Sequence, residues 1–165
     1  LCRDWSSDVC SSDLIDRVDR LPDGGHVVID YKSGEADPRD WLGVRPDEPQ
    51  LPIYAVSDPQ PPTAVLFAQL RAGDLRYRGV AERGGLVPEV GDYGSARKKP
   101  DDPRDWPALL AQWRVAVTAL AEEFVQGVAR VAPKYDDTCR YCHLQALCRI
   151  HERGALSREG DDAQG

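Results

Sequence analysis

The chain has 165 residues, enough for one domain with or without tails. It is 41% hydrophobic and 30% charged, and it has no apolar run of the roughly 18 residues that a membrane-spanning helix needs. This composition excludes a transmembrane helix and a wholly disordered chain, so we expect no membrane partner. The net charge of -7 gives no sign of the basic surface that is typical of nucleic-acid binding. A nucleic-acid partner must therefore be argued from a site.

The first residues do not read as natural protein. Residues 3–14 match, over all twelve positions, the translation of a common short-read sequencing adapter. We therefore expect residues 1–14 not to be native, and a gene that is cut before Ile15. The alternative is a natural tail rich in Ser and Asp. If the segment is an adapter, Cys2 and Cys10 leave the count of native cysteines.

Four strands and two helices are predicted in the remaining chain. Residues 15–21 alternate apolar and polar side chains, and residues 26–31 are β-branched and apolar. A Pro-Asp-Gly-Gly turn between them predicts a hairpin. A polar loop then leads to a short helix that starts near Pro49, and two further strands are expected over residues 64–70 and 75–80. A long helix follows from near Pro107, with Asp105 as its cap.

The long helix is expected to be amphipathic. Spacings of three and four indicate that one apolar face packs on the core; its members are Leu110, Trp113, Val117, Leu120, Phe124 and Val128. We expect Trp106 and Trp113 to lie in the core rather than to stack on bases. Lys98 and Lys99 are expected in an exposed loop, and His26 is expected to be exposed beside its turn.

Two acids and a lysine are predicted to meet on one face of the hairpin. Asp30 ends a strongly apolar strand, where a charge is costly unless it has a partner or a task. Lys32 is two residues further on and points to the same face, which Asp16 can reach from the neighbouring strand. Carboxylates at such a point suit Mg²⁺, and a lysine there can orient water and neutralise charge on a phosphoryl group. Taken alone, the Asp-x-Lys pattern also fits a surface ion pair.

Three short motifs occur in one order: Ile-Asp-Arg-Val-Asp, then Val-Ile-Asp-Tyr-Lys-Ser-Gly, then Gln-Leu-Pro-Ile-Tyr. Together they resemble the RecB-type nucleases of the PD-(D/E)XK superfamily. The resemblance implies that Asp16 and Asp30 bind Mg²⁺ and that Lys32 is catalytic. It also implies that Gln50 and Tyr54, four residues apart on one helical face, contribute to the site and to DNA contact.

The resemblance covers residues 15–150 and implies an α/β fold, a restriction-endonuclease-like core with a mixed sheet flanked by helices. It implies Mg²⁺-dependent, exonuclease-like cleavage of DNA, on single strands or at ends, in DNA repair or recombination. A helicase subunit or domain is the expected partner. We also expect a polar tail over residues 151–165.

A second motif follows the long helix: Cys139, Cys142 and Cys148 in Cys-x2-Cys-x5-Cys spacing. An odd number of close cysteines is not a disulfide framework. Nothing indicates secretion, so a cytoplasmic protein with metal-bound thiolates is expected. The spacing resembles that of AddB-like nucleases, in which a fourth, upstream cysteine completes a four-iron four-sulfur cluster. That cysteine is missing here. Zinc bound with His143 or His151 is the alternative, as are free thiols.

Two other classes of function remain open. One is a catalytically silent DNA-binding scaffold, since the family's helical motif before Asp16 is absent. The other is a zinc-binding interaction domain.

Overall fold

The computed structural model describes residues 15–95, 99–140 and 142–149. The adapter-like residues 1–14, Lys98, His151 and the expected tail over 151–165 lie outside the described residues. The chain divides into two compact units, Leu1–Glu122 and Glu123–Gly165, and each is considered separately below.

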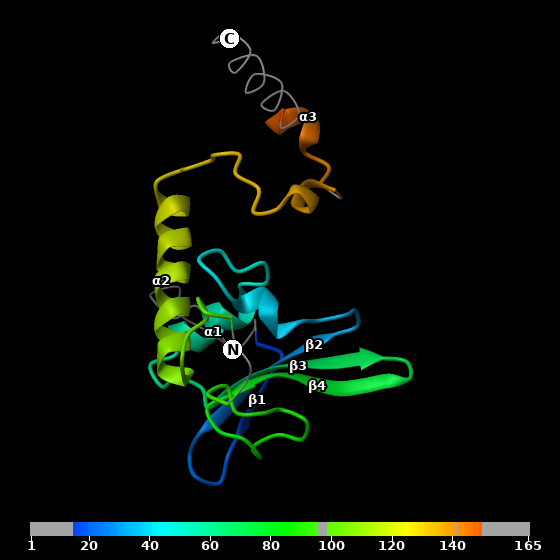
Figure 1. Cartoon of the computed structure of the whole chain (residues 1–165), viewed down its shortest axis with the longest axis vertical. Coiled ribbons are helices and arrows are strands. Elements are labelled where there is room, and N and C mark those ends of the chain that lie inside the picture. Colours follow the sequence, from blue (N-terminus) through cyan, green and yellow to red (C-terminus); the bar gives the residue numbers. More distant parts are fainter. Residues whose placement is uncertain (1–14, 96–98, 141, 150–165) are drawn as a thin grey trace, which may run out of the picture. The chain divides into compact units, whose positions relative to one another are not determined.

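The first unit is built on a four-stranded mixed sheet (Figure 1). In spatial order its strands are β1 (Arg17–Arg20), β2 (His26–Lys32), β3 (Ala64–Arg71) and β4 (Asp74–Ala81). β1 and β2 form the expected antiparallel hairpin, β2 and β3 run parallel, and β3 and β4 form a second hairpin. Because parallel strands need a crossover, the chain between β2 and β3 carries a 3-10 helix, η2 (Pro38–Trp41), and α1 (Gln50–Ser57).

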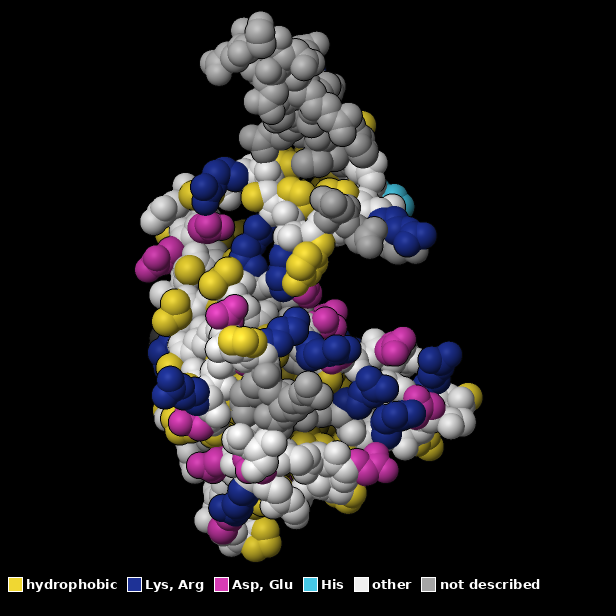
Figure 2. Space-filling view, viewed as in Figure 1, with side chains coloured by type: hydrophobic (Ala, Val, Ile, Leu, Met, Phe, Trp, Pro, Cys, Tyr) yellow, Lys and Arg dark blue, Asp and Glu magenta, His cyan; other side chains and the backbone are white. Residues whose placement is uncertain are grey.

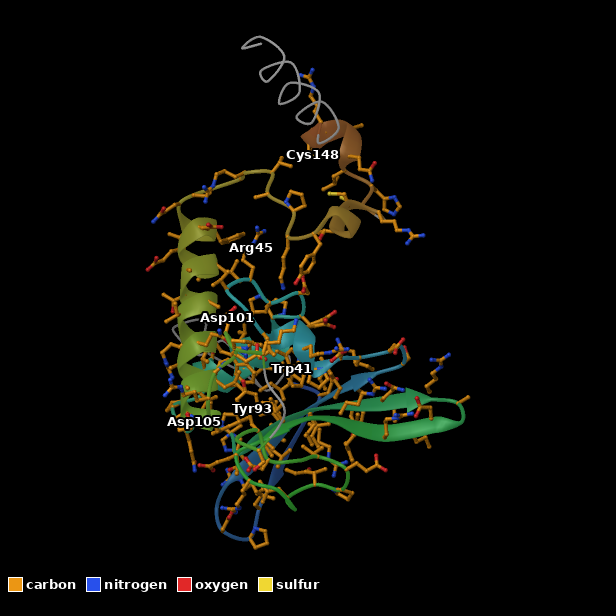
Figure 3. All side chains as sticks on the ribbon, viewed as in Figure 1. Trp41, Arg45, Tyr93, Asp101, Asp105 and Cys148 are labelled. Carbon is orange, nitrogen blue, oxygen red and sulfur yellow. The ribbon has the colours of Figure 1, made fainter. Side chains whose placement is uncertain are left out.

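One face of the sheet is covered by helices. Val28, Val65 and Phe67 point to this face and pack on Trp41 of η2, on α1 and on α2 (Trp106–Val125). The indole nitrogen of Trp113 donates a hydrogen bond to the Trp41 carbonyl oxygen at 2.9 Å. The rings of Trp41 and Phe67 lie 4.6 Å apart, centroid to centroid. Trp41 thus joins the long helix to the sheet beneath it (Figure 3), and the expected sheet with flanking helices is confirmed.

The opposite face of the sheet is covered by the segment that follows β4. Val90, with Leu86 and Val87, packs on the side chains of β2 and β3 that point away from the helices. β4 must come close to β3 here. A Cβ at Gly79 would collide with the Val65 carbonyl oxygen and with the side chain of Leu66. This position of β4 therefore requires glycine.

The long helix is present but buries a different stripe from the one expected. It begins at Trp106, and Asp105 caps it by accepting a hydrogen bond from the Ala108 amide at 2.9 Å. Its buried residues are Trp106, Leu109, Trp113 and Ala116. The expected face was wrong at its far end, where Phe124 is 86% exposed and the helix stops at Val125. The buried residues of α2 are those that pack on Trp41 and on the sheet.

His26 also differs from its expected state. It is 8% exposed rather than open to solvent. The reason is that the segment after α1 runs alongside it: the Thr63 amide donates to the His26 carbonyl oxygen at 2.8 Å, and Asp58 Oδ2 lies 3.7 Å from His26 Nε2.

The second unit contains two short helical turns, η3 (Asp136–Cys139) and α3 (Gln145–Cys148). Both carry cysteines of the expected motif. Among the described residues, no helix is both long and apolar enough to cross a membrane.

Candidate active site

The acid–lysine pair lies where β2 leaves the core. Residues 26–30 of β2 are buried, Tyr31 is exposed and Lys32 is half-buried. Strand alternation puts Asp30 and Lys32 on the helix-covered face, beyond Val28. Asp30 pairs with Phe67 of β3, and Lys32 pairs with Gln69. The sequence-based placement of the two side chains on one face is therefore observed.

Asp16 reaches the same place from the residue just before β1. The ladder pairs Arg17 with Ile29, so Asp16 stands opposite Asp30. Asp16 Oδ2 accepts a hydrogen bond from the Tyr31 amide at 2.8 Å. This bond holds one carboxylate beside the other across the β1–β2 hairpin. Asp19 instead pairs with Arg17 at 2.7 Å.

Lys32 sits between two carboxylates and an aromatic ring. Its Nζ lies 3.1 Å from Asp30 Oδ2 and 3.6 Å from Glu48 Oε2. The same nitrogen lies 5.5 Å from the centre of the Phe67 ring, within the range of a cation–π contact. Glu48 comes from the loop before α1 and was not identified from the sequence. Its only sequence signal is an acid two residues before Gln50, which is weak.

The site shifts the pKa values of its groups. Burial raises the pKa of Asp30 above its ordinary value; the contact with Lys32 opposes this, and the nearby Asp16 carboxylate adds to the rise. Burial lowers the pKa of Lys32, but the contacts with Asp30 and Glu48 outweigh it, so that this pKa is raised. Lys32 is thus held charged beside a carboxylate that is costly to ionise.

Gln50 and Tyr54 form a pair on the first two turns of α1. Gln50 Nε2 donates a hydrogen bond to Tyr54 Oη at 3.1 Å, and the Tyr54 side chain packs against the core cluster under the site face. Pro52 is buried in the first turn, where its missing amide breaks no helical bond. The predicted helical face shared by Gln50 and Tyr54 is therefore present.

Two arginines of β4 extend the site face. The sheet register forms two rows across three strands: Asp30–Phe67–Arg78 and Lys32–Gln69–Arg76. Arg78 Nη1 donates to the Ala36 carbonyl oxygen at 3.3 Å, while Arg76 pairs with Asp74. Lys and Arg side chains alternate with Asp and Glu over this end of the sheet (Figure 2). The local surface therefore carries charges of both signs, and Arg76 and Arg78 are its basic residues on β4.

The cysteine motif lies in the second unit, and its three thiols are all free. The Leu144 amide donates to Cys142 Sγ at 3.4 Å, and Cys148 is half-buried in α3 (Figure 3). Within the described ranges, no three His, Cys, Asp or Glu side chains come together as a metal site. The three cysteines are therefore close in sequence without being gathered around one point.

Comparison with known proteins decides the family. The profile of the PD-(D/E)XK nuclease superfamily matches residues 14–149. The chain belongs to this superfamily. No curated protein and no solved structure matches it. Members of the PD-(D/E)XK superfamily are generally nucleases that act on DNA and typically use Mg²⁺. The mixed sheet with flanking helices agrees with their restriction-endonuclease-like fold.

Proposed function

We propose that this PD-(D/E)XK protein is a Mg²⁺-dependent deoxyribonuclease whose centre is Asp16, Asp30 and Lys32. The observation that carries the proposal is the meeting of these three side chains at the end of β2. A surface ion pair would not need two acids, one of them 4% exposed, on the same side of the sheet.

The donor set fits a hard cation. Asp30 Oδ2 is buried, and the Lys32 ammonium lies 3.1 Å from it. Asp16 is exposed, with one oxygen fixed on the Tyr31 amide. Mg²⁺ retains several waters and is commonly held by one or two carboxylates. Asp16 and Asp30 would hold it, and the bound ion would stabilise charge on the scissile phosphoryl group and acidify a water.

The chain's own residues supply the remaining functions. Lys32 would orient the attacking water and neutralise the charge that develops on the phosphoryl oxygens. Glu48 positions the lysine from its second side. Gln50 and Tyr54 would contact the DNA near the scissile bond, and Arg76 and Arg78 would bind backbone phosphates.

Cleavage of labelled single- and double-stranded DNA, with Mg²⁺ or with EDTA, tests the proposal. We expect metal-dependent cleavage by the wild type, and a loss of at least about a hundredfold in Lys32→Ala. Lys99→Ala removes an exposed lysine and is the matched control, expected to cleave normally. Equal cleavage by wild type and Lys32→Ala would overturn the assignment. DNA binding by a folded protein that never cleaves would favour the scaffold role.

We further propose a biological setting for this activity. Residues 15–150 would act as one nuclease domain, exonuclease-like, in DNA repair or recombination beside a helicase subunit or domain. The three motifs in their expected order support this setting, because they resemble the RecB-type group. Stimulation of cleavage by a helicase and ATP on duplex DNA is its test.

For the cysteine motif we propose iron–sulfur ligation. Cys139, Cys142 and Cys148 would be three of the four ligands of a four-iron four-sulfur cluster. Three free thiols within ten residues support this role, as does the amide that points to Cys142 Sγ. Anaerobically purified protein should be brown, with about four iron per chain. One zinc per chain and no iron would contradict the cluster and favour a zinc site at these cysteines.

A further inference from the structure

The face of the sheet opposite the acid pair has a hollow of about 350 Å³ near the end of the β3–β4 hairpin. Tyr31, Ala68 and Tyr77 line it, and they form one row across three strands: Tyr31 pairs with Ala68, and Ala68 pairs with Tyr77. Paired residues point to the same face, so the small alanine, which is only 4% exposed, lies between two aromatic side chains.

The dimensions of this row suit a flat aromatic ligand. Neighbouring strands are about 4.8 Å apart, which separates the two tyrosine backbones by roughly 10 Å. A plate stacked between two rings needs two van der Waals separations, together about 7–8 Å. Tyr77 packs on the core cluster of this face and Tyr31 is 41% exposed, so one wall is fixed and the other is open to solvent.

The hollow is lined by two basic residues, Arg17 and Arg76, and one acidic residue, Glu89. Arg17 Nη1 donates a hydrogen bond to Tyr31 Oη at 3.4 Å, and its Nε is held by Asp19. Glu89 stands on the rim with a backbone φ of 66°. This conformation is costly for a residue with a Cβ, and such residues concentrate at ligand-binding sites. A guanidinium suits a phosphate, whereas a carboxylate accepts hydrogen bonds from amino groups.

We propose that this hollow binds one nucleobase of single-stranded DNA, stacked between Tyr31 and Tyr77. The inference rests on the proposed nuclease function and adds its substrate class. Aromatic stacking with a nearby arginine is the usual basis of single-strand binding. Tyr31 lies between Asp30 and Lys32 in sequence but points to the other face. The bound base therefore belongs to a nucleotide near the cleaved bond, rather than at it.

Glu89 gives the site a base preference. Its carboxylate only accepts hydrogen bonds; cytosine, adenine and guanine offer it an exocyclic amino group, whereas thymine offers only its single ring N3–H. Oligo-dC should therefore bind more tightly than oligo-dT, and Glu89→Gln should reduce that difference.

Binding of short fluorescent oligonucleotides in EDTA tests the hollow without cleavage. Tyr77→Ala should weaken binding by roughly 5- to 150-fold, the range that corresponds to loss of one stacked base. Tyr77→Phe keeps the ring and should bind within about twofold of the wild type. Because Tyr77 is partly buried, Tyr31→Ala at the exposed wall repeats the test, and thermal melting reports the fold of each variant.

The outcomes separate the two proposals. Wild-type affinity for single strands in folded Tyr77→Ala and Tyr31→Ala would overturn the proposed base-binding role of the hollow. So would an absence of any single-strand binding by the wild type. Neither result bears on the nuclease, which depends on Lys32-dependent cleavage. Conversely, weaker binding in both alanine variants of a protein that never cleaves would leave a single-strand binding site and remove the nuclease.

Discussion

Asp16 is fastened to β2 by the Tyr31 amide, 2.8 Å from its Oδ2. The amide that donates this hydrogen bond belongs to Tyr31, which lies directly between Asp30 and Lys32 in the chain. The hairpin therefore does more than pair strands, because it gives the first carboxylate a fixed position beside the second. Substitutions at Asp16 can separate the structural use of this oxygen from its chemical use.

Asp16→Asn keeps an oxygen for the Tyr31 amide but loses the charge, whereas Asp16→Ala loses both. We expect both variants to lose metal-dependent cleavage. Only Asp16→Ala should lose stability, by about 1 kcal/mol, the usual net value of one hydrogen bond. Urea unfolding checks the second part. Full cleavage by Asp16→Asn would contradict the role of Asp16 as a metal ligand.

Asp30 is expected to lower the stability of the metal-free protein. Its pKa in the folded state is raised, first by burial, so the unfolded chain gives up this proton more readily. The neutral Asp30 carboxyl therefore stabilises the folded state fully below its ordinary pKa near 3.8. This stabilisation is lost as the pH rises through the pKa that Asp30 has in the folded state. At pH 7, Asp30→Asn should melt at the same or a higher temperature than the wild type, without activity. The exposed Asp101→Asn is the control.

Addition of Mg²⁺ should reverse that order. The ion binds the ionised folded site, so it should raise the melting temperature of the wild type and leave Asp30→Asn unchanged. An equal Mg²⁺-induced shift in both proteins would show that the ion binds elsewhere.

Glu48 is expected to position Lys32 without being essential. The contact is 3.6 Å long and the Glu48 side chain is 48% exposed, so its energetic value is small. Glu48→Gln should lower kcat no more than about fivefold, with KM unchanged, and Glu82→Gln should have no effect. Since both acids hold the pKa of Lys32 above 10.5, cleavage should show no loss from lysine deprotonation below about pH 10. A loss of cleavage activity centred at pH 8 and caused by deprotonation of Lys32 would contradict this prediction.

Tyr93 makes stability depend on alkaline pH. It is 4% exposed and lies in the core beneath the helices (Figure 3). Burial, together with the charges of Asp102 and Asp105, raises its pKa to about 12. Its neutral form stabilises the fold fully below pH 10, and we expect on the order of 2 kcal/mol to be lost between pH 10 and 12. Urea unfolding across this range checks it, and Tyr93→Phe should flatten the decline. An identical decline in the variant would assign the effect to other groups.

Much of the sheet and half of the site could be predicted from local pattern. The apolar run ending in Asp30 and the turn before it are enough to define the hairpin, and alternation puts Lys32 beside Asp30. Contacts made by loops were not predictable in this way. Trp41 and Glu48 lie in a polar segment without periodicity, and only the fold brings Glu48 to Lys32.

The long helix shows the same limit. Its sequence has apolar residues on more than one side, so spacing alone could not choose between the stripe with Leu110 and Val117 and the one with Leu109 and Ala116. The choice is made by Trp41, whose carbonyl oxygen accepts the Trp113 hydrogen bond. His26 was misplaced for a related reason, since its cover comes from the distant segment at Thr63.

The central claim is that Asp16 and Asp30 together hold the catalytic cation. Anomalous diffraction from crystals soaked in Mn²⁺, a substitute for Mg²⁺, tests it most directly. The account predicts one manganese peak within coordinating distance of both carboxylates, absent in Asp30→Asn. A peak at any other group, or none in crystals of a protein that cleaves DNA with Mn²⁺, would contradict it.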